Sequence, residues 1–465
     1  MSSSKTTSFA TSRETSSLRK RVLNAGRWTL ISYGFSYAFR LGSNLLMTRL
    51  LLPEMFGVMA IAMMVLVGLA LFSDVGLKPS VVQNKRGDDP LFLNTAWVIQ
   101  IVRGVVLWSG GVAISLLIVA AGRFGLIPQG SVYADPILPY VIGVMSLFSL
   151  ISGFESTRSL QASRDLQLAK LTRIDVGSQV IGFAVTVGYA IALPSIWALV
   201  AGTLASASTR TVLSHLWLPG IRNHFAWDRA AYGEIMRFGK WIFLSSVLFF
   251  VASNGDRMLL GALIDPTSLG TYSIAFLIFS SIDQVLTKII VDVSFPALSE
   301  VVRGNRAGLR AAYYRFHIAI ASGAYFCAGA LIFSGNALIS LLYDRRYGQA
   351  GWMLEILALA LFAQPFRTAT QTFLALGMAR IYFHLHTIRI VTLFVALPVG
   401  FYFWSLEGAV YGIVLSYFSS LPWVIKHAAT ADLLDWRKEL IPIPAAILGV
   451  LCGEAFALSV ARLSH

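Results

Sequence analysis

Charged residues are scarce in this chain, and their scarcity argues against a soluble globular fold. Asp, Glu, Lys and Arg make up 13% of the 465 residues, whereas soluble domains carry about 25%. Hydrophobic residues make up 56% and recur in runs of about 18 residues or more, each long enough to cross about 30 Å of hydrocarbon. Strictly alternating runs of about ten residues, which a transmembrane β-barrel needs, do not occur. The sequence therefore predicts an all-α polytopic membrane protein.

Motifs for catalysis and metal binding are also missing. The chain has two cysteines and seven histidines, and Cys327 and Cys452 both lie in apolar runs without partners at disulfide or metal-ligand spacing. The closest histidines are His384 and His386, whose rings would point apart on a helix. No GxxxxGK[ST] loop is present, so nothing indicates ATP hydrolysis. We expect no enzyme activity, no catalytic residues, no cofactor and no metal site.

Connections between the apolar runs are short. The longest on one side, near residues 122–136 and 335–348, hold about 15 residues each, far fewer than the roughly 50 of the smallest typical domain. They leave no room for a catalytic domain outside the membrane. We predict thirteen spans, at residues 25–50, 55–77, 92–121, 137–157, 172–193, 195–217, 238–263, 268–297, 311–334, 349–377, 381–403, 405–424 and 440–461.

Positive charge is distributed unevenly between the two sides. The net charge is +14, and of the 37 Lys and Arg residues we place 25 on one side, 5 on the other and 7 within spans. Cytoplasmic loops carry such an excess of Lys and Arg, so the bias predicts that the N-terminus is cytoplasmic. Because topology accounts for the charge, nucleic acid is not an expected partner. Residues 1–24, rich in Ser and Thr, are expected to form a disordered cytoplasmic tail rather than a signal peptide.

A repeated motif divides the chain. The stretch at residues 51–62 reads LLPEMFGVMAIA and the stretch at 264–275 reads IDPTSLGTYSIA, with Pro, Gly, Ile and Ala at identical spacing. Over residues 26–65, ten positions are identical to those 213 residues later, beginning with Gly26 and Gly239. Six predicted spans, an even number, separate the two copies, so both halves cross the membrane in the same direction. Such a parallel repeat is a plan used by secondary transporters.

The repeat predicts the architecture. We expect two six-helix lobes in a parallel pseudo-two-fold repeat, plus about one extra C-terminal span. The segments are a tail at residues 1–24, an N-lobe at 25–218, a cytoplasmic linker at 219–237, a C-lobe at 238–427 and the extra span at 428–465.

The repeated motif itself has the features of a helix start. Pro53 and Pro266 suit the first turn of a helix, where a missing N–H costs nothing. Asp265 is placed to act as the N-cap of the second copy. Gly57 and Gly270 would let a neighbouring helix approach closely. We therefore interpret the motif as the hairpin between the first two spans of each lobe, and we predict no substrate site there.

Ionisable side chains inside the spans are the candidates for a functional site, because charge at membrane depth is costly and usually faces a cavity or a partner. Arg40 in the first span and Arg257 in its repeat mate would converge on a central cavity if spans 1 and 7 face each other. Guanidinium groups suit an anion such as phosphate, which they bind bidentately. The alternative for each arginine is an intramembrane ion pair or snorkelling. The predicted substrate-binding residues are Arg40, Arg257, Arg103 and Arg210, the predicted coupling or charge partners are Asp256, Asp283 and Asp175, and the other basic residues within spans are Lys288, Arg367 and Arg389.

Five stretches in fixed order resemble a known family. They are TRLLLPEMFGVMAIAMMV (48–65), FSDVGLKPSVVQNKRGDDP (72–90), SFPALSEV (294–301), LLYDRRYGQAGWMLEILAL (341–359) and FLALGMARIYF (373–383). Over about residues 25 to 430 the chain is similar to the polysaccharide transporter family, the Wzx/WzxC-type oligosaccharide flippases of the multidrug/oligosaccharidyl-lipid/polysaccharide (MOP) exporter superfamily. Arg345 and Arg346 depart from the family pattern by adding positive charge just before the Tyr-Gly pair.

The resemblance implies two MATE-like lobes around a cavity that opens alternately to each side. It also implies transport of a polyprenyl-diphosphate-linked oligosaccharide to the periplasmic leaflet for exopolysaccharide or lipopolysaccharide synthesis. Membrane lipid, that substrate and the polysaccharide polymerase and export machinery are the implied partners. The diphosphate fits the arginines in the spans, and a gradient of cations rather than ATP would drive transport.

Three alternatives remain open on the sequence. A cation-coupled MATE-like drug exporter would need a cavity dominated by acidic residues, and here the arginines outnumber them. A membrane polysaccharide polymerase or ligase would need a longer outer catalytic loop than the predicted topology supplies. A lipid scramblase without coupling is compatible with the pattern.

Overall fold

The computed structural model describes residues 39–72, 77, 80–81, 84, 86–165, 167–304 and 306–463. Three parts of the predictions lie outside these residues: the tail at 1–24, the first part of the first span at 25–38, and the Gly26, Trp28 and Ser32 positions of the repeat. Within the described part every regular element is a helix, which confirms the predicted all-α fold. Eight of these helices are long and apolar enough to cross a membrane, or nine if a bent pair near residues 138–164 is one span.

The described residues form two compact units. Unit 1 holds residues up to Leu51, Ala62–Leu126 and Pro136–Phe249, and unit 2 holds Leu52–Ile61, Ile127–Asp135 and the residues from Phe250 onward. The predicted lobe boundaries and the parallel repeat stay predictions. The helices of unit 1, some of which continue into unit 2, are α2 (Pro53–Phe72), α4 (Pro90–Arg123), α5 (Leu138–Met145), α6 (Leu147–Gly153), α7 (Arg158–Arg164), α8 (Leu168–Ala192), α9 (Ile196–Leu216) and α10 (Arg229–Leu263). Those of unit 2 are α11 (Pro266–Ile289), α12 (Phe295–Gly304), α13 (Leu309–Leu342), α14 (Ala350–Ala358), α15 (Arg367–Ala375), α16 (Ala379–Phe418), α17 (Leu421–Thr430), α18 (Trp436–Glu439) and α19 (Ile443–Leu463).

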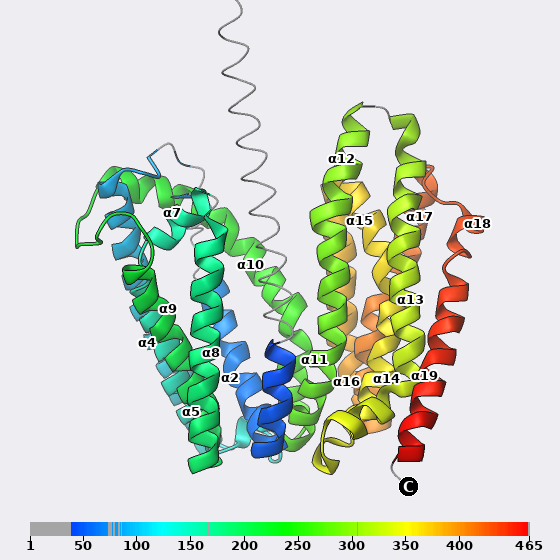
Figure 1. The fold of residues 1–465 in the computed structure, drawn as a ribbon, viewed down its shortest axis with the longest axis horizontal. Helices are drawn as coiled ribbons and strands as arrows, with labels where there is room; N and C mark the ends of the chain where they lie inside the picture. The colour runs from blue at the N-terminus through cyan, green and yellow to red at the C-terminus, as the bar shows by residue number, and fades with distance from the viewer. Residues whose placement is uncertain are drawn as a thin grey trace, which may run out of the picture. The chain divides into compact units, whose positions relative to one another are not determined.

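Glycines allow the helices of unit 1 to pack closely. On α8 and α9, which lie side by side (Figure 1), a Cβ atom at either Gly182 or Gly202 would lie 2.7 Å from the carbonyl oxygen of the other. On α4, a Cβ at Gly104 would lie 2.8 Å from the carbonyl oxygen of Ser149 on α6. Small residues at such crossings are typical of membrane helices, whose association depends on van der Waals packing.

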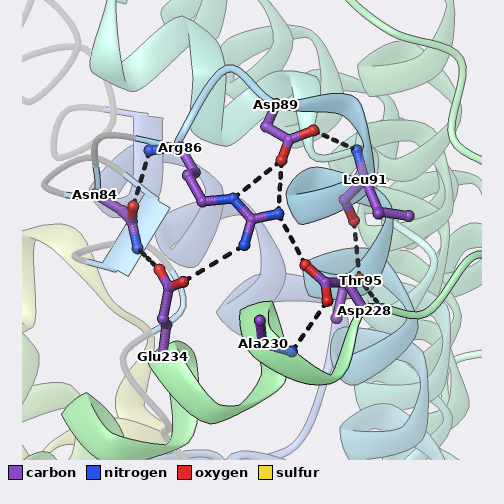
Figure 2. Close-up of polar contacts among 8 residues, drawn as sticks. All are labelled: Asn84, Arg86, Asp89, Leu91, Thr95, Asp228, Ala230 and Glu234. Carbon is purple, nitrogen blue, oxygen red and sulfur yellow. Dashed lines mark hydrogen bonds and ion pairs between the residues drawn. The ribbon is translucent and has the colours of Figure 1, made fainter.

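The start of α10 is bound to the start of α4 by a network centred on Arg86 (Figure 2). The Arg86 guanidinium donates to Asp89 at 2.7 Å and to Asp228 at 2.8 Å, and it lies 3.4 Å from Glu234. Asp228 also caps α10, because its Oδ1 accepts from the amide of Ala230 at 3.0 Å. This cap explains why α10 begins at Arg229, within the segment predicted as a linker, rather than at residue 238.

The Arg86 network makes the attachment of the linker sensitive to acid. Hydrogen bonds from Arg86 lower the pKa of Asp228 and of Asp89. A carboxyl group whose pKa is lower in the folded state stabilises the fold above its unfolded pKa of about 3.9, and this stabilisation is lost as the pH falls through the folded value.

We therefore expect hydrogen exchange of residues 222–234 to stay slow at neutral pH and, after correction for intrinsic rates, to accelerate below about pH 4. Arg86→Gln should produce the fast exchange already at neutral pH, whereas Arg229→Gln on the neighbouring exposed side chain should not. Slow exchange in Arg86→Gln at neutral pH would contradict this role of the network.

Two spans predicted in unit 2 as continuous helices are interrupted. In the predicted span 349–377, a 3-10 stretch at Leu359–Phe366 containing Pro365 separates α14 from α15. Proline has no N–H and its ring crowds the preceding turn, so a regular α-helix cannot continue through it. In the predicted span 268–297, a π-helical turn at Ile290–Ser294 joins α11 to α12.

Helix α16 contains the predicted span 381–403 and most of the predicted span 405–424, folded back on each other. The chain reverses at Trp404 and Ser405, where Ser405 has a φ of 52°. The two arms touch through their backbones, since a Cβ at either Gly400 or Gly408 would lie 2.1 Å from the carbonyl oxygen of the other. The hairpin therefore needs almost no loop.

The extra C-terminal span, α19, packs along α13 in unit 2 (Figure 1). Gly449 and Gly453 lie one turn apart, and a Cβ on them would lie 2.2 Å from the carbonyl oxygen of Phe326 and 2.4 Å from that of Ala330. Reciprocally, a Cβ on Gly329 would lie 2.4 Å from a carbonyl of α19. Cys452 lies exposed on this helix.

A buried polar cluster also joins α13 to the start of the C-terminal span. His317 on α13 is fully buried, and its Nε2 lies 3.0 Å from Oε2 of Glu439. The Tyr314 hydroxyl donates to the other carboxylate oxygen of Glu439 at 2.8 Å. The Tyr313 hydroxyl lies 3.2 Å from His317 Nδ1. Every polar side-chain atom of Glu439 and His317 thus has a hydrogen-bond partner inside unit 2.

The two copies of the repeated motif contact each other within unit 2. A Cβ at Gly57 would lie 2.0 Å from the carbonyl oxygen of Pro266, and a Cβ at Gly270 would lie 1.9 Å from that of Pro53. Asp265 caps α11, accepting from the amides of residues 267 and 268 at 2.9 and 3.0 Å. The predicted cap and the predicted close approach at both glycines are confirmed.

Candidate functional site

The predicted site residue Arg210 forms an ion-paired group inside unit 1. From α9, its Nε donates to Glu155 Oε2 at 3.2 Å, and its Nη1 is hydrogen-bonded to Asp175 on α8. The structure thus joins two predicted site residues, Arg210 and Asp175, in an arrangement that matches the ion-pair alternative. Glu155 was not among the predicted site residues, although a glutamate at the end of a predicted span was a visible signal. The substrate role of Arg210 and the coupling role of Asp175 stay predictions.

The other two candidate arginines of unit 1 lie apart from that group in the sequence. Arg103 on α4 donates through Nη2 to the carbonyl oxygen of Ala70 on α2 at 2.7 Å. Arg40 is exposed on the described part of the first predicted span. Arg40 belongs to unit 1 and Arg257 to unit 2, so their convergence stays a prediction.

In unit 2, Asp256 and Arg257 follow each other on α10 and bind different neighbours. Asp256 is 6% exposed and its Oδ2 accepts from the Tyr272 hydroxyl at 2.5 Å. The Arg257 guanidinium stacks over the Phe276 ring, 4.5 Å from its centroid. Its Nη1 donates at 3.4 Å to Oδ1 of Asn254, one turn earlier. Arg257 therefore rests on an aromatic face, while its neighbour Asp256 is held by a tyrosine.

Two further basic residues lie on α15 and α16. Arg367 Nη1 donates to Asp283 Oδ1 on α11 at 3.4 Å and is also hydrogen-bonded to the Thr287 hydroxyl. The Arg389 guanidinium lies over the Tyr417 ring, 3.8 Å from its centroid. Neither arginine was among the predicted substrate-binding residues, although both were recognised as basic groups within spans.

These side chains form one group around Tyr417, which we name the unit 2 polar cluster. A row of rings links the two stacked arginines, because the Phe279 ring lies 5.9 Å from that of Phe276 and 5.8 Å from that of Tyr417. Asp283, which pairs with Arg367, lies one turn beyond Phe279 on α11. The cluster brings three guanidinium groups together with two carboxylates. Its members are Asp256, Arg257, Asp283, Arg367, Arg389 and Tyr417.

The stacked arginines of the cluster are suited to binding an anion. Among the described residues, no ion pair is recorded for Arg257 or Arg389. Guanidinium stays protonated in proteins, and stacking on a ring leaves its in-plane N–H groups able to donate to oxygen atoms. Within the described part of the chain, no group of three His, Cys, Asp or Glu side chains could hold a metal ion.

Solved structures with the same fold are transporters and a flippase. An inward-facing multidrug resistance MATE family transporter of the MOP superfamily matches 92% of this chain and 96% of its own, with a TM-score of 0.60 and 15% identity. The lipid II flippase MurJ in an inward closed conformation matches 93% and 98%, with a TM-score of 0.61 and 12% identity. The chain thus has the helical fold of the MOP superfamily.

Sequence comparisons point to polysaccharide biosynthesis. The chain is 22% identical over 347 residues to the lipopolysaccharide biosynthesis protein WzxC of Escherichia coli strain K12, covering 73% of this chain and 67% of that protein. It is 22% identical over 344 residues to the succinoglycan biosynthesis transport protein ExoT of Rhizobium meliloti strain 1021, covering 73% and 66%. The matches thus span about two thirds of these relatives. A family model described as polysaccharide biosynthesis protein matches residues 46–350, and the chain therefore belongs to this family.

Proposed function

We propose that this protein flips a polyprenyl-diphosphate-linked oligosaccharide from the cytoplasmic to the periplasmic leaflet by alternating access. The observation that carries the proposal is the pair of arginines, Arg257 and Arg389, that stack on aromatic rings in unit 2. Charge at membrane depth is costly and marks substrate or ion pathways. A diphosphate supplies the oxygen atoms that such guanidinium groups bind bidentately.

The chemistry of the substrate suits a membrane-embedded cationic site. Its diphosphate carries the negative charge, its glycan needs a polar route, and its polyprenyl chain can stay in lipid. Arg40, Arg103 and Arg210 are proposed as further contacts for the diphosphate. The names of the relatives support a role in exopolysaccharide or lipopolysaccharide synthesis at the bacterial inner membrane, alongside the polymerase and export machinery.

Coupling to a cation gradient would act through the carboxylates of the unit 2 polar cluster. Asp283 is 16% exposed and pairs with Arg367, which is 27% exposed. Protonation of Asp283 would remove this ion pair, and Arg367 would then be available to bind an anionic ligand. Asp256, held by Tyr272, is the second candidate for this role.

A second candidate function is export of an organic cation, which the fold shared with a MATE transporter makes reasonable. A cationic drug needs a carboxylate that can face it. In the described part of unit 2, the two carboxylates of the cluster already bind Tyr272 and Arg367. The excess of arginine in the cluster favours an anionic substrate.

Replacement of the stacked arginines should abolish most transport. We expect Arg257→Ala and Arg389→Ala each to lower flipping of a lipid-linked oligosaccharide by about ten- to a hundredfold, the value of one or more charged hydrogen bonds. The measurement is surface polysaccharide and accumulated lipid-linked intermediate in a deletion strain that expresses each variant at equal level.

Arg315→Ala, which removes an exposed arginine from α13, serves as the matched control and should keep full transport. Normal polysaccharide export in both Arg257→Ala and Arg389→Ala would overturn the site. Loss of resistance to cationic dyes with unchanged polysaccharide would favour the exporter.

A further inference from the structure

A groove lies between α16 and α17 on the surface of unit 2. Its volume is about 280 Å³, close to the lower end of the roughly 300–1,000 Å³ of ligand pockets. Four of its six lining residues are Ile, Leu or Trp, and none is acidic. They are Ile381, His384, Leu385, Ile388, Trp423 and His427.

The groove lies on a different face of α16 from the unit 2 polar cluster. At 100° per residue, Ile381, Leu385 and Ile388 share one face of the helix, while Arg389 points about 75° away from their mean direction. Beyond the groove, the same face continues with the strongly exposed side chains of Val395 (58%) and Val399 (49%). Strongly exposed valines along a membrane helix are expected to face the lipid, so the groove opens on the lipid-facing side of α16.

Basic residues lie next to residues that line the groove. Lys426 is exposed and its Nζ lies 5.4 Å from the centroid of Trp423, which is itself 48% exposed. His384 Nδ1 donates to the carbonyl oxygen of Arg380 at 2.6 Å, so Nε2 is the ring nitrogen left for a ligand. Arg380 is exposed one turn before His384. Among the described residues, no ion pair is recorded for Lys426 or Arg380.

The groove and these basic residues lie near the predicted cytoplasmic surface of the membrane. Arg310, at the start of α13, pairs with Asp432 just beyond the end of α17. The groove therefore lies at the end of unit 2 that carries the basic segment around Arg303 and Arg306, which the charge distribution predicts to be cytoplasmic. Exposed tryptophan is enriched at membrane–water interfaces, and basic pockets between membrane helices on the cytoplasmic side bind anionic lipid headgroups.

We propose that this groove binds an anionic phospholipid of the cytoplasmic leaflet. One hydrocarbon chain lies against Ile381, Leu385 and Ile388 and continues along the exposed valines of α16. The phosphate of the headgroup is bound by Arg380 and Lys426, with His384 beside them. This lipid is distinct from the transported substrate, and its site requires neither the unit 2 polar cluster nor the proposed transport.

Native mass spectrometry of the full-length protein, delipidated in detergent, tests the site with phosphatidylglycerol and phosphatidylcholine of identical chains. We expect the protein to bind phosphatidylglycerol more tightly than phosphatidylcholine. Arg380→Gln and Lys426→Gln should each weaken phosphatidylglycerol binding by about fivefold, the contribution of one basic residue near an anionic surface. Ile388→Trp, which fills the groove, should weaken both lipids by at least about fivefold.

Matched controls separate this site from general lipid adhesion. Leu458→Trp adds the same ring at an exposed position of α19, outside the groove, and Arg303→Gln with Arg306→Gln removes two exposed charges outside it. Neither should change the affinity. Equal binding of the two lipids, or equal losses in the control and groove variants, would overturn the proposal. Displacement of phosphatidylglycerol by free glycerol phosphate alone would show that a soluble phosphate, and not a lipid, is the ligand.

Discussion

A single methyl group at Gly57 or Gly270 should strongly destabilise the protein. Gly57→Ala and Gly270→Ala each place a Cβ atom 1.9–2.0 Å from a proline carbonyl oxygen in the paired motif, and neither backbone can yield without separating α2 from α11. We expect each to lower the free energy of unfolding by about 1–3 kcal/mol or more, the cost of overpacking. The measurement is the melting temperature of the purified protein in detergent.

The control is an alanine that meets open space. A Cβ atom added to Gly323 in α13 would have no neighbouring side chain or helix within 4 Å, and a helical glycine changed to alanine gains about 0.5–1 kcal/mol. Gly323→Ala should therefore leave the melting temperature unchanged or raise it, whereas Gly57→Ala should lower it. Because the two motif glycines share one crossing, their double variant should cost less than the sum of the single costs. Unchanged melting in both single variants would refute the close contact.

Removing the Glu439 carboxylate should be the most destabilising change near the C-terminus. Glu439→Ala leaves Nε2 of the fully buried His317 without its partner and removes the shorter of the two hydrogen bonds that the Tyr314 hydroxyl donates. A buried polar group left without its hydrogen-bond partner costs about 1–3 kcal/mol, and more where the lost partner was charged. We expect loss of the melting transition of unit 2, or a large fall in its midpoint, together with faster proteolysis of α19.

The companion double variant distinguishes a broken pair from lost packing. His317→Leu with Glu439→Leu removes both polar partners, and replacing a whole buried pair by apolar residues is often nearly neutral. The double variant should therefore be more stable than Glu439→Ala. Arg437→Ala, on an exposed side chain two residues earlier, should melt like the unchanged protein. A Glu439→Ala protein as stable as Arg437→Ala would exclude the cluster as the anchor of α19.

Local features of the fold were predictable from the sequence because their causes are local. Asp265 before Pro266 is an N-cap signal that depends on a few neighbouring residues, and the structure confirms it. The apolar runs likewise predicted the helices, since each run contains its own reason to lie in a membrane. The interruption at Pro365 had a local signal too, and the overall hydrophobicity of the run masked it.

Contacts between distant segments were not predictable, because their partners are set by packing. Glycine at 57 and 270 predicted a close neighbour, but only the structure shows that the neighbour is the other copy of the motif. Arg367 and Asp283 were both visible as charges, 84 positions apart, with nothing in either stretch to pair them. The stacked pair Arg389 and Tyr417 was hidden for the same reason.

The hairpin inside α16 has a consequence for how unit 2 assembles. Its arms meet between Gly400 and Gly408, so the chain that must close to bring them together is only a few residues long. The entropy cost of loop closure grows with the length of the loop, and contacts between near neighbours form first. The two arms can therefore pair as soon as both have entered the bilayer, before the C-terminal span has been synthesised. Helix α19, whose glycines contact α13 more than a hundred residues earlier, docks last onto a surface that is already built.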